Sequence, residues 1–242
     1  MKRSFSTVLA VTALLGFTLL APLAYGQGAS AGGSVATKEN LDLPFDAIGD
    51  SEDEEDAPEI IVFYGQQYEG DGIFFCCDKS SSMEGQKFAV LQKEVIKNVS
   101  SFSDKVQFGI VFFDAGLWKF PPSGRPAEAN PAMKAAASSF VMSTATGHGT
   151  CAKAALVTAL AFANQSTSKR RLIIHLSDGQ NWCNGQDPST YGPTVLTEVT
   201  AKNTSGVHIN AICIGPAGGD VNEDWMRKLA AQNNGAYARI VQ

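Results

Sequence analysis

Residues 73–83 read IFFCCDKSSSM, an apolar run that ends at Cys77 and is followed by an acid and two hydroxyls at alternate positions, Asp78, Ser80 and Ser82. A short apolar run with a long amphipathic segment after it is typical of a buried strand that leads into a helix. At the carboxyl end of such a strand, the three side chains bring hard oxygen atoms into one loop. Hard oxygens are the ligands that a small divalent cation such as Mg²⁺ prefers.

Two further loops carry oxygen-bearing side chains. Asp178 follows the apolar run of residues 172–176, in the same kind of place as Asp78. Thr150 ends the sequence Gly-His-Gly-Thr at residues 147–150, directly ahead of a helical pattern. The three loops together outline a candidate metal site made of five residues: Asp78, Ser80, Ser82, Thr150 and Asp178.

The order of the expected elements predicts the fold class. Apolar runs predict strands at residues 60–64, 73–77, 106–113, 172–177, 207–214 and 236–241, with a short edge strand near Trp118 and Phe120. Helical spacing predicts helices at residues 85–99, 132–142, 151–163, 190–203 and 221–233, the last capped by Asp220 or Asn222. Strands and helices alternate, and most strands are apolar on both faces, which predicts an α/β fold with a doubly wound, mostly parallel sheet flanked by helices. Ligands of such sheets bind beyond the carboxyl ends of the strands, where the strand order reverses.

The amino-terminal part of the chain differs in composition from the rest. Residues 1–26 combine a charged start, an apolar run over residues 8–20 and small residues before Gln27, which predicts a signal peptide; an uncleaved anchor is the alternative. Residues 27–58 are rich in Gly, Ala, Ser and acid, so we expect a disordered acidic linker. The folded domain would then cover residues 59–242, be secreted or face the periplasm or the cell exterior, and have no membrane span after cleavage.

Net charge argues against one class of partner. From residue 60 onward the chain carries 16 Lys and Arg residues and 14 Asp and Glu residues, while the whole chain has a formal charge of −5. A nearly neutral domain without a basic stripe argues against binding to nucleic acid. The short basic run at residues 169–171 directly precedes an expected strand, so we interpret it as a solvated turn.

Five cysteines in a chain expected to be exported form an odd set. Cys76, Cys77 and Cys213 lie in expected strands and are interpreted as small core residues. Cys151 follows Thr150, and Cys183 follows Asp178 in the next loop. Because both loops are expected at the candidate site, a disulfide between Cys151 and Cys183 is one alternative and two free thiols are the other.

With these motifs in place, residues 60–242 resemble the von Willebrand factor type A (VWA) domain family. The hallmark of that family is a metal-ion-dependent adhesion site built from Asp-x-Ser-x-Ser, a later Thr and a later Asp that is often followed by Gly. The matching residues here are Asp78, Ser80, Ser82, Thr150 and Asp178. All three pieces occur in order and on the expected elements, so the match is far more specific than any single piece.

The resemblance implies a role for each residue. Ser80 and Ser82 would bind the cation directly, Thr150 would bind it directly or through water, and Asp78 and Asp178 would hold coordinated waters. One position would then remain for an Asp or Glu side chain of a protein partner. Mg²⁺ is the expected cation, with Mn²⁺ and Ca²⁺ as alternatives.

Two residues depart from the family pattern. Ser81 stands where the family commonly has Gly, which puts the loop geometry in question. Lys79 is unusual beside Asp78, and we expect its long side chain to swing into solvent. Asp114 and Glu84 are expected to be solvated as well, and an influence of either on the field at the cation is the alternative. Trp182 is either an exposed contact beside the cation or tucked over its loop.

The sequence therefore predicts a non-enzymatic, exported adhesion domain that recognises a protein partner through a cation. One alternative is a metal-assisted phosphatase or hydrolase on a similar sheet, although Ser80 replaces the second acid of an Asp-x-Asp site. A subtilisin-like role for His148 would require a later Gly-Thr-Ser-type segment, which is absent from the sequence, so we interpret His148 as a rim residue. A structural module with a vestigial metal site is the third alternative. The partner and the oligomeric state are left open.

Overall fold

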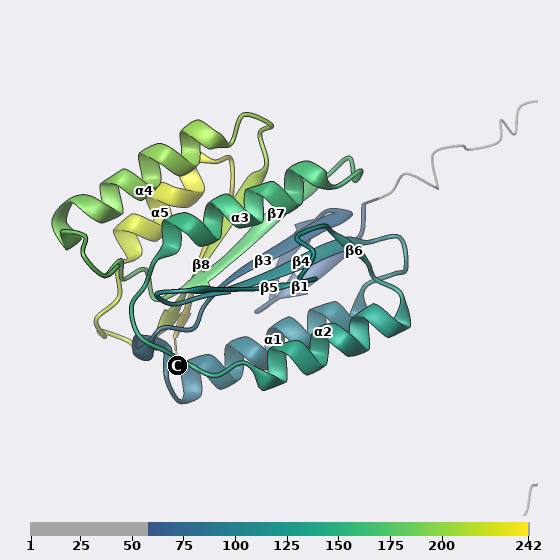
Figure 1. Ribbon diagram of the computed structural model, residues 1–242, viewed down its shortest axis with the longest axis horizontal. Helices are drawn as coiled ribbons and strands as arrows, with labels where there is room; N and C mark the ends of the chain where they lie inside the picture. The colour runs from purple at the N-terminus through teal and green to yellow at the C-terminus, as the bar shows by residue number, and fades with distance from the viewer. Residues whose placement is uncertain (1–57, 242) are drawn as a thin grey trace, which may run out of the picture. The chain divides into compact units, whose positions relative to one another are not determined.

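The computed structural model describes residues 58–241, in which a central sheet lies between two layers of helices (Figure 1). The predicted α/β class is confirmed. The strands of the main sheet are β3 (Gly72–Asp78), β4 (Gln107–Phe113), β5 (Leu117–Phe120), β6 (Ala127–Glu128), β7 (Arg171–Ser177), β8 (His208–Gly215) and β9 (Tyr237–Val241). Each of β3, β4, β7 and β8 is almost wholly buried, as expected for strands covered on both faces.

The strand order of the main sheet is β5-β4-β3-β7-β8-β9, and β6 pairs with β4. The pairs among β4, β3, β7, β8 and β9 are parallel, while β5 and β6 run antiparallel to β4. The chain leaves β3 for β4 on one side and later returns to β7 on the other side, so the order reverses between β3 and β7. The carboxyl ends of these two strands carry Asp78 and Asp178.

The helices divide between the two faces of the sheet (Figure 1). One face is covered by α1 (Gln86–Ser101) and α2 (Pro131–Ser143), and the other by α3 (Ala152–Gln165), α4 (Pro188–Lys202) and α5 (Glu223–Gln232). Phe75, Leu91 and Phe108 belong to the core on the first face, and Phe74, Leu156 and Met226 to the core on the second. The helix predicted over residues 221–233 begins later, and Asn222 caps it by accepting a hydrogen bond from the backbone of Trp225.

Two short elements were missing from the sequence-based expectation. The turn after β1 (Ile60–Phe63) leads into β2 (Gln66–Glu69), an antiparallel partner, in a segment for which no strand was predicted. Tyr64 and Gly65 both have positive φ, 48° and 77°, which is the backbone of a tight two-residue hairpin. Strand β6 is only two residues long and lies between the edge strand predicted near Trp118 and the helix predicted from residue 132. Neither element is long enough to show a clear alternation of apolar and polar residues.

The predicted signal peptide and almost all of the predicted acidic linker lie outside the described residues. Between residues 58 and 241, none of the helices combines the length and apolar character needed to cross a membrane.

Candidate metal centre

The three predicted loops meet at the carboxyl edge of the sheet. The loop after β3 lies against the segment before α3, since Ser80 and Gly147 form an isolated parallel bridge and the Gly147 amide donates to the Lys79 carbonyl at 2.7 Å. The Thr150 amide donates to the carbonyl of Trp182, in the loop after Asp178, at 2.5 Å. Tertiary structure thus brings the loops of all five candidate residues together.

The two serine hydroxyls of the first loop have the spacing of neighbouring metal ligands. The Oγ atoms of Ser80 and Ser82 lie 3.0 Å apart and share a hydrogen bond in which either hydroxyl can donate. Two adjacent ligands of an octahedral Mg²⁺ with bonds of about 2.1 Å are separated by about 3 Å. The Asp78 carboxylate supports this loop by accepting from the Ser80 amide at 2.8 Å. These oxygens therefore fit a small divalent cation.

Ser81 does not strain the loop. It begins a short 3₁₀ helix, η3 (Ser81–Met83), and the only non-glycine residues of the described chain with positive φ are Tyr64 and Asn234. The doubt raised by Ser in place of Gly is thereby removed.

Asp78 is fully buried at the end of β3. Its Oδ2 atom accepts a hydrogen bond from the Ser177 hydroxyl at 2.6 Å. Burial, followed by the nearby charge of Asp178, raises the pKa of Asp78 to about 7, and the hydrogen bonds from Ser177 and Ser80 oppose that rise only in part. The charges of the two buried carboxylates thus oppose each other, and a metal ion near both would relieve that cost.

Asp178 is also fully buried, and it has a cation beside it. The ammonium of Lys87, from the first turn of α1, donates to Asp178 Oδ2 at 3.2 Å. The backbone N–H of Gln180 donates to the other carboxylate oxygen, Asp178 Oδ1, at 3.2 Å. Sequence reasoning missed Lys87, whose position on the helix gave no sign that it would reach a residue 91 positions away.

The expectation that Lys79 is solvated was wrong. Its ammonium is buried and donates to Asp114 at 2.7 Å and to the Ala145 carbonyl at 3.0 Å, and it lies 3.8 Å from the centre of the Trp118 ring. Asp114, also expected in solvent, is 6% exposed. Asp114 directly follows β4, and Asp78 is the last residue of β3; this similarity of position was the available signal. A Cβ atom at Gly147 would collide with the Asp114 carboxylate, so the close approach requires glycine there.

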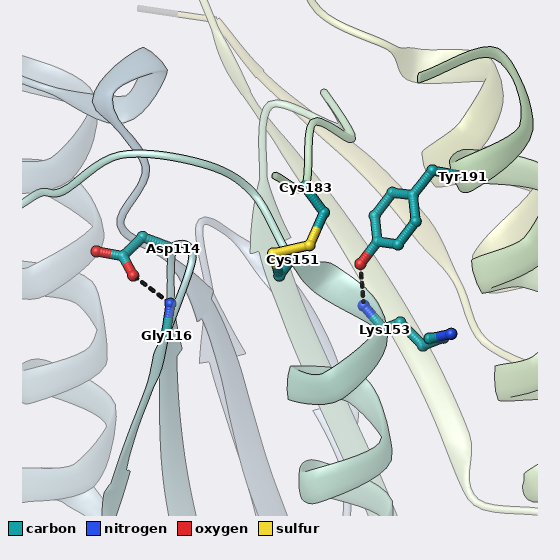
Figure 2. Close-up of a disulfide and its surroundings, with 6 residues drawn as sticks. All are labelled: Asp114, Gly116, Cys151, Lys153, Cys183 and Tyr191. Atoms are coloured by element: carbon teal, nitrogen blue, oxygen red, sulfur yellow. Dashed lines mark hydrogen bonds between the residues drawn. A yellow bond between two sulfur atoms is a disulfide. The ribbon is translucent and has the colours of Figure 1, made fainter. Parts of the chain in front are cut away.

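A disulfide joins Cys151 and Cys183, which resolves the pairing left open by the sequence. Figure 2 shows it linking the start of α3 to the loop after β7, beside the hydroxyl of Tyr191, which accepts a hydrogen bond from the Lys153 amide at 3.3 Å. The bond ties the loop of Thr150 to the loop of Asp178. The other three cysteines are buried and free, as expected of core residues.

The rim of the site carries exposed side chains. His148 is exposed, as expected of a rim residue, and Trp182 is 54% exposed. Within residues 58–241, no group of three or more His, Cys, Asp and Glu side chains is arranged to hold a metal. The candidate centre is of a different chemical kind, two carboxylates with three hydroxyls.

Comparison with known proteins identifies the family of this chain. Residues 72–242 match the sequence profile described as the von Willebrand factor type A domain. Inter-alpha-trypsin inhibitor heavy chain H4 of Homo sapiens is 29% identical over 175 residues, covering 69% of this chain and 18% of the human protein. The chain therefore spans less than a fifth of that relative.

Solved structures show the same fold. A von Willebrand factor type A protein from Catenulispora acidiphila aligns with a TM-score of 0.63 and 19% identity, over 77% of this chain and 47% of the other. The pilus adhesin SpaC from Lactobacillus rhamnosus GG aligns with a TM-score of 0.58 and 18% identity, over 73% of this chain and 28% of SpaC. Together with the profile match, the fold shows that this chain belongs to the von Willebrand factor type A domain family.

Proposed function

We propose that this domain is an exported adhesion module that captures an Asp or Glu side chain of a protein partner through a divalent cation. The observation that carries the proposal is that the loop of Ser80 and Ser82, whose hydroxyls lie 3.0 Å apart, meets the loop of Thr150 at the strand ends that carry the buried Asp78 and Asp178. Ser80, Ser82 and Thr150 would hold the cation, which supplies a positive charge for an incoming carboxylate. Mg²⁺ is the proposed ion because it prefers octahedral oxygen and retains waters.

The placement of the carboxylates determines how attractive the site is to an anion. Asp78 is held by Ser80 and Ser177, and Asp178 by Lys87 and Gln180. Carboxylates engaged in this way would accept hydrogen bonds from coordinated waters while neutral hydroxyls bind the ion directly. The ion then keeps more of its charge for the partner than it would with two directly bound carboxylates.

The surroundings of the site favour binding over catalysis. Both lysines that approach it are engaged, Lys79 by Asp114 and Lys87 by Asp178. An acyl or phosphoryl transfer site needs an activated nucleophile or a general base within hydrogen-bond reach of the reacting atoms. We therefore propose a non-enzymatic role. SpaC, a pilus adhesin of the same fold, accords with surface display.

The decisive experiment measures cation binding and partner capture in matched variants. We expect calorimetry with MgCl₂ and MnCl₂ to give heat and raised melting temperature for the wild-type domain, because a ligand that binds only the folded state stabilises it. Asp78→Ala and Asp178→Ala should lose both effects and lose capture of the partner from the exported fraction. Ser101→Ala, on the remote end of α1, is the matched control and should behave as wild type.

The results separate the alternatives. Capture that persists in EDTA would contradict recognition through a cation. Absence of any heat or stabilisation with both metals would indicate a vestigial site, and metal-dependent turnover of generic phosphoesters would indicate an enzyme.

A further inference from the structure

A large cavity lies at the edge of the main sheet opposite the candidate metal centre. One cavity, of about 750 Å³, opens beside Trp182 near the metal centre, whereas this one, of about 690 Å³, lies at the amino ends of β7, β8 and β9. Strand β2 forms one wall, and the other walls are the basic run at residues 169–171, the start of β8 and residues 234–236 before β9. The basic run, interpreted from the sequence as a solvated turn, therefore lines a cavity.

Strand β2 presents an open backbone edge to this cavity. Among the described strands it pairs only with β1, and the Gly70 amide donates to the Glu59 carbonyl at 3.0 Å. In an antiparallel pair, only alternate residues exchange hydrogen bonds with the opposite strand. The N–H and C=O groups of Gln67 and Glu69 therefore point away from β1, and both residues line the cavity. A strand edge of this kind can accept one more extended segment.

The facing wall offers a side-chain donor. Asn210 lines the cavity and is 5% exposed, and its Oδ1 atom accepts from the Ala236 amide at 2.8 Å. Its Nδ2 group donates to no described residue and is not one of the fully enclosed atoms that lack a partner, so it keeps surface that a ligand can reach. An unused N–H group on a side chain that is otherwise buried matches a carbonyl or carboxylate of a ligand.

The charges of the wall favour an acidic ligand. The three cationic side chains of the basic run line the cavity together with one carboxylate, that of Glu69. Arg170 pairs with Asp71 at 3.4 Å, while Arg171 donates to a backbone carbonyl at 3.2 Å and forms no ion pair with a described residue. Three cations thus meet two carboxylates, and positive charge is in excess.

The chain itself supplies an acidic segment next to this cavity. Residues 51–57 read SEDEEDA, with five carboxylates and no basic residue. The described chain continues from Pro58 to Glu59, which is held against Gly70 at the end of β2. Neighbouring strands are about 4.8 Å apart and an extended chain advances about 3.3 Å per residue, so about three residues are enough to pass from the start of β1 to the far edge of β2.

We propose that residues 51–57 occupy this cavity as an extended segment along the open edge of β2, with their carboxylates against the basic run. Their backbone groups would pair with those of Gln67 and Glu69, and Asn210 Nδ2 would donate to the segment. The proposal does not depend on the function proposed for the metal centre. An occupied cavity would hold the chain that precedes the domain at the edge opposite the metal centre, which leaves that centre open to a partner.

Amide hydrogen exchange, measured by NMR on the intact chain, provides the first test. The wild type is compared with a fivefold variant that neutralises the segment: Glu52→Gln, Asp53→Asn, Glu54→Gln, Glu55→Gln and Asp56→Asn. We expect the Gln67 and Glu69 amides to exchange at least about tenfold faster in the fivefold variant, because the hydrogen bonds that protect them open more often. The Val62 amide, on the opposite edge of the same hairpin, is the internal control and should exchange equally in both proteins.

A fluorescent peptide with the sequence of residues 51–57 provides the second test. It should bind the fivefold variant at least about tenfold more tightly than the wild type, in which the tethered segment competes at high effective concentration. A peptide N-methylated at alternate backbone nitrogens cannot pair along β2 and should bind the fivefold variant at least about fivefold more weakly.

Two double variants with the same change of charge test the basic run. Added to the fivefold variant, Lys169→Gln with Arg171→Gln should weaken peptide binding at least about fivefold, since charge-assisted contacts are lost. Lys97→Gln with Lys228→Gln, at exposed positions of α1 and α5, is the matched control and should leave peptide binding unchanged.

The contrary outcomes are distinct. Equal exchange of Gln67 and Glu69 in the wild type and the fivefold variant, or equal peptide binding by the two, would overturn the proposal, the latter because the cavity is then open to an external acidic partner. Protection that falls on dilution would assign the cavity to the segment of a second copy of the chain and overturn occupation within one chain. Equal losses in the two double variants, or equal binding of the N-methylated peptide, would overturn the assignment to the basic run or to the edge of β2.

Discussion

The ammonium of Lys79 lies 2.7 Å from the carboxylate of Asp114, and the exposed fractions of the two side chains are 7% and 8%. This buried pair connects the ends of β3 and β4, and the further hydrogen bond from Lys79 to the Ala145 carbonyl extends it to the loop before α3. The pair thus braces the loop of Ser80 and Ser82 without contributing a ligand. Removing one member leaves the other charge buried and uncompensated.

We therefore expect Lys79→Met and Asp114→Asn each to lower the free energy of unfolding by about 3 kcal/mol. The double variant should lose less than the sum of the two, because no unpaired charge remains. Urea denaturation of the wild type, the two single variants and the double variant gives the coupling energy between Lys79 and Asp114. Additive losses would show that the pair does not act as a unit.

Cation binding should depend on pH through Asp78. Its pKa is raised to about 7 in the metal-free protein, so the carboxyl group carries a proton below that pH, and an incoming cation must displace it. The affinity for Mg²⁺ should rise by up to about tenfold per pH unit between pH 5.5 and 7 and level off above. Calorimetry in buffers of different ionisation enthalpy should detect proton release at pH 6 but not at pH 8.5. A flat profile would contradict this role of Asp78.

Lys87 should oppose cation binding. Its ammonium lies 3.2 Å from Asp178 Oδ2, and its side chain is 19% exposed, so part of its charge is screened by water. Lys87→Met should tighten Mg²⁺ binding by about three- to tenfold. Lys97→Met, at an exposed position of the same helix, is the matched control and should leave the affinity unchanged. Weaker binding in Lys87→Met would indicate that Lys87 positions Asp178 rather than competing with the ion.

The disulfide should stabilise both the fold and the site. Cys151 and Cys183 are 32 positions apart. Closing a loop of that length lowers the entropy of the unfolded chain and raises its free energy by about 3–4 kcal/mol. The paired variant Cys151→Ser/Cys183→Ser should show that loss in urea denaturation. It should also bind Mg²⁺ more weakly, because only the hydrogen bond from the Thr150 amide to the Trp182 carbonyl then ties Thr150 to the loop of Asp178. An unchanged affinity would separate the stabilising role from the site.

His175 should make the fold sensitive to acid. It is fully buried between Phe113 and Trp225, and burial lowers its pKa from 6.5 to about 3. Between these values the unfolded chain binds a proton that the folded chain does not, so this residue's contribution to stability is complete above pH 6.5 and is lost as the pH falls.

The lost free energy at pH 4 should be about 3 kcal/mol relative to pH 7. In His175→Phe, the difference between the free energies of unfolding at pH 7 and at pH 4 should be smaller by that amount. Asp78 acts in the opposite direction: its folded-state pKa is raised from 3.8 to about 7, so its contribution falls as the pH rises between those values. His175→Phe is for that reason best compared with its parent protein when both also carry Asp78→Asn. If His175→Phe leaves this difference unchanged, groups other than His175 cause the acid sensitivity.

Much of the fold could be predicted because its signals are local. The run before Asp78 and the run before Asp178 are apolar on both faces, so each could be identified as a covered parallel strand from its own residues. The hairpin at Tyr64 and Gly65 and the short strand β6 could not, because two to four residues carry too little periodicity. The prediction for Lys79 failed because a long side chain beside a strand end looks solvated until the neighbouring strand supplies Asp114.

The amino-acid sequence by itself determined the alternation of strands and helices and the order of oxygen-bearing residues at the strand ends, because periodicity and residue chemistry act over a few neighbouring positions. Tertiary structure alone decided which charges meet: Lys79 with Asp114, and Lys87 with Asp178. It also decided that Cys151 lies within reach of Cys183 and that a cavity opens beside Trp182. These contacts join residues about 30 to 90 positions apart, and their distances follow from strand register and helix packing, which no short stretch of the chain encodes.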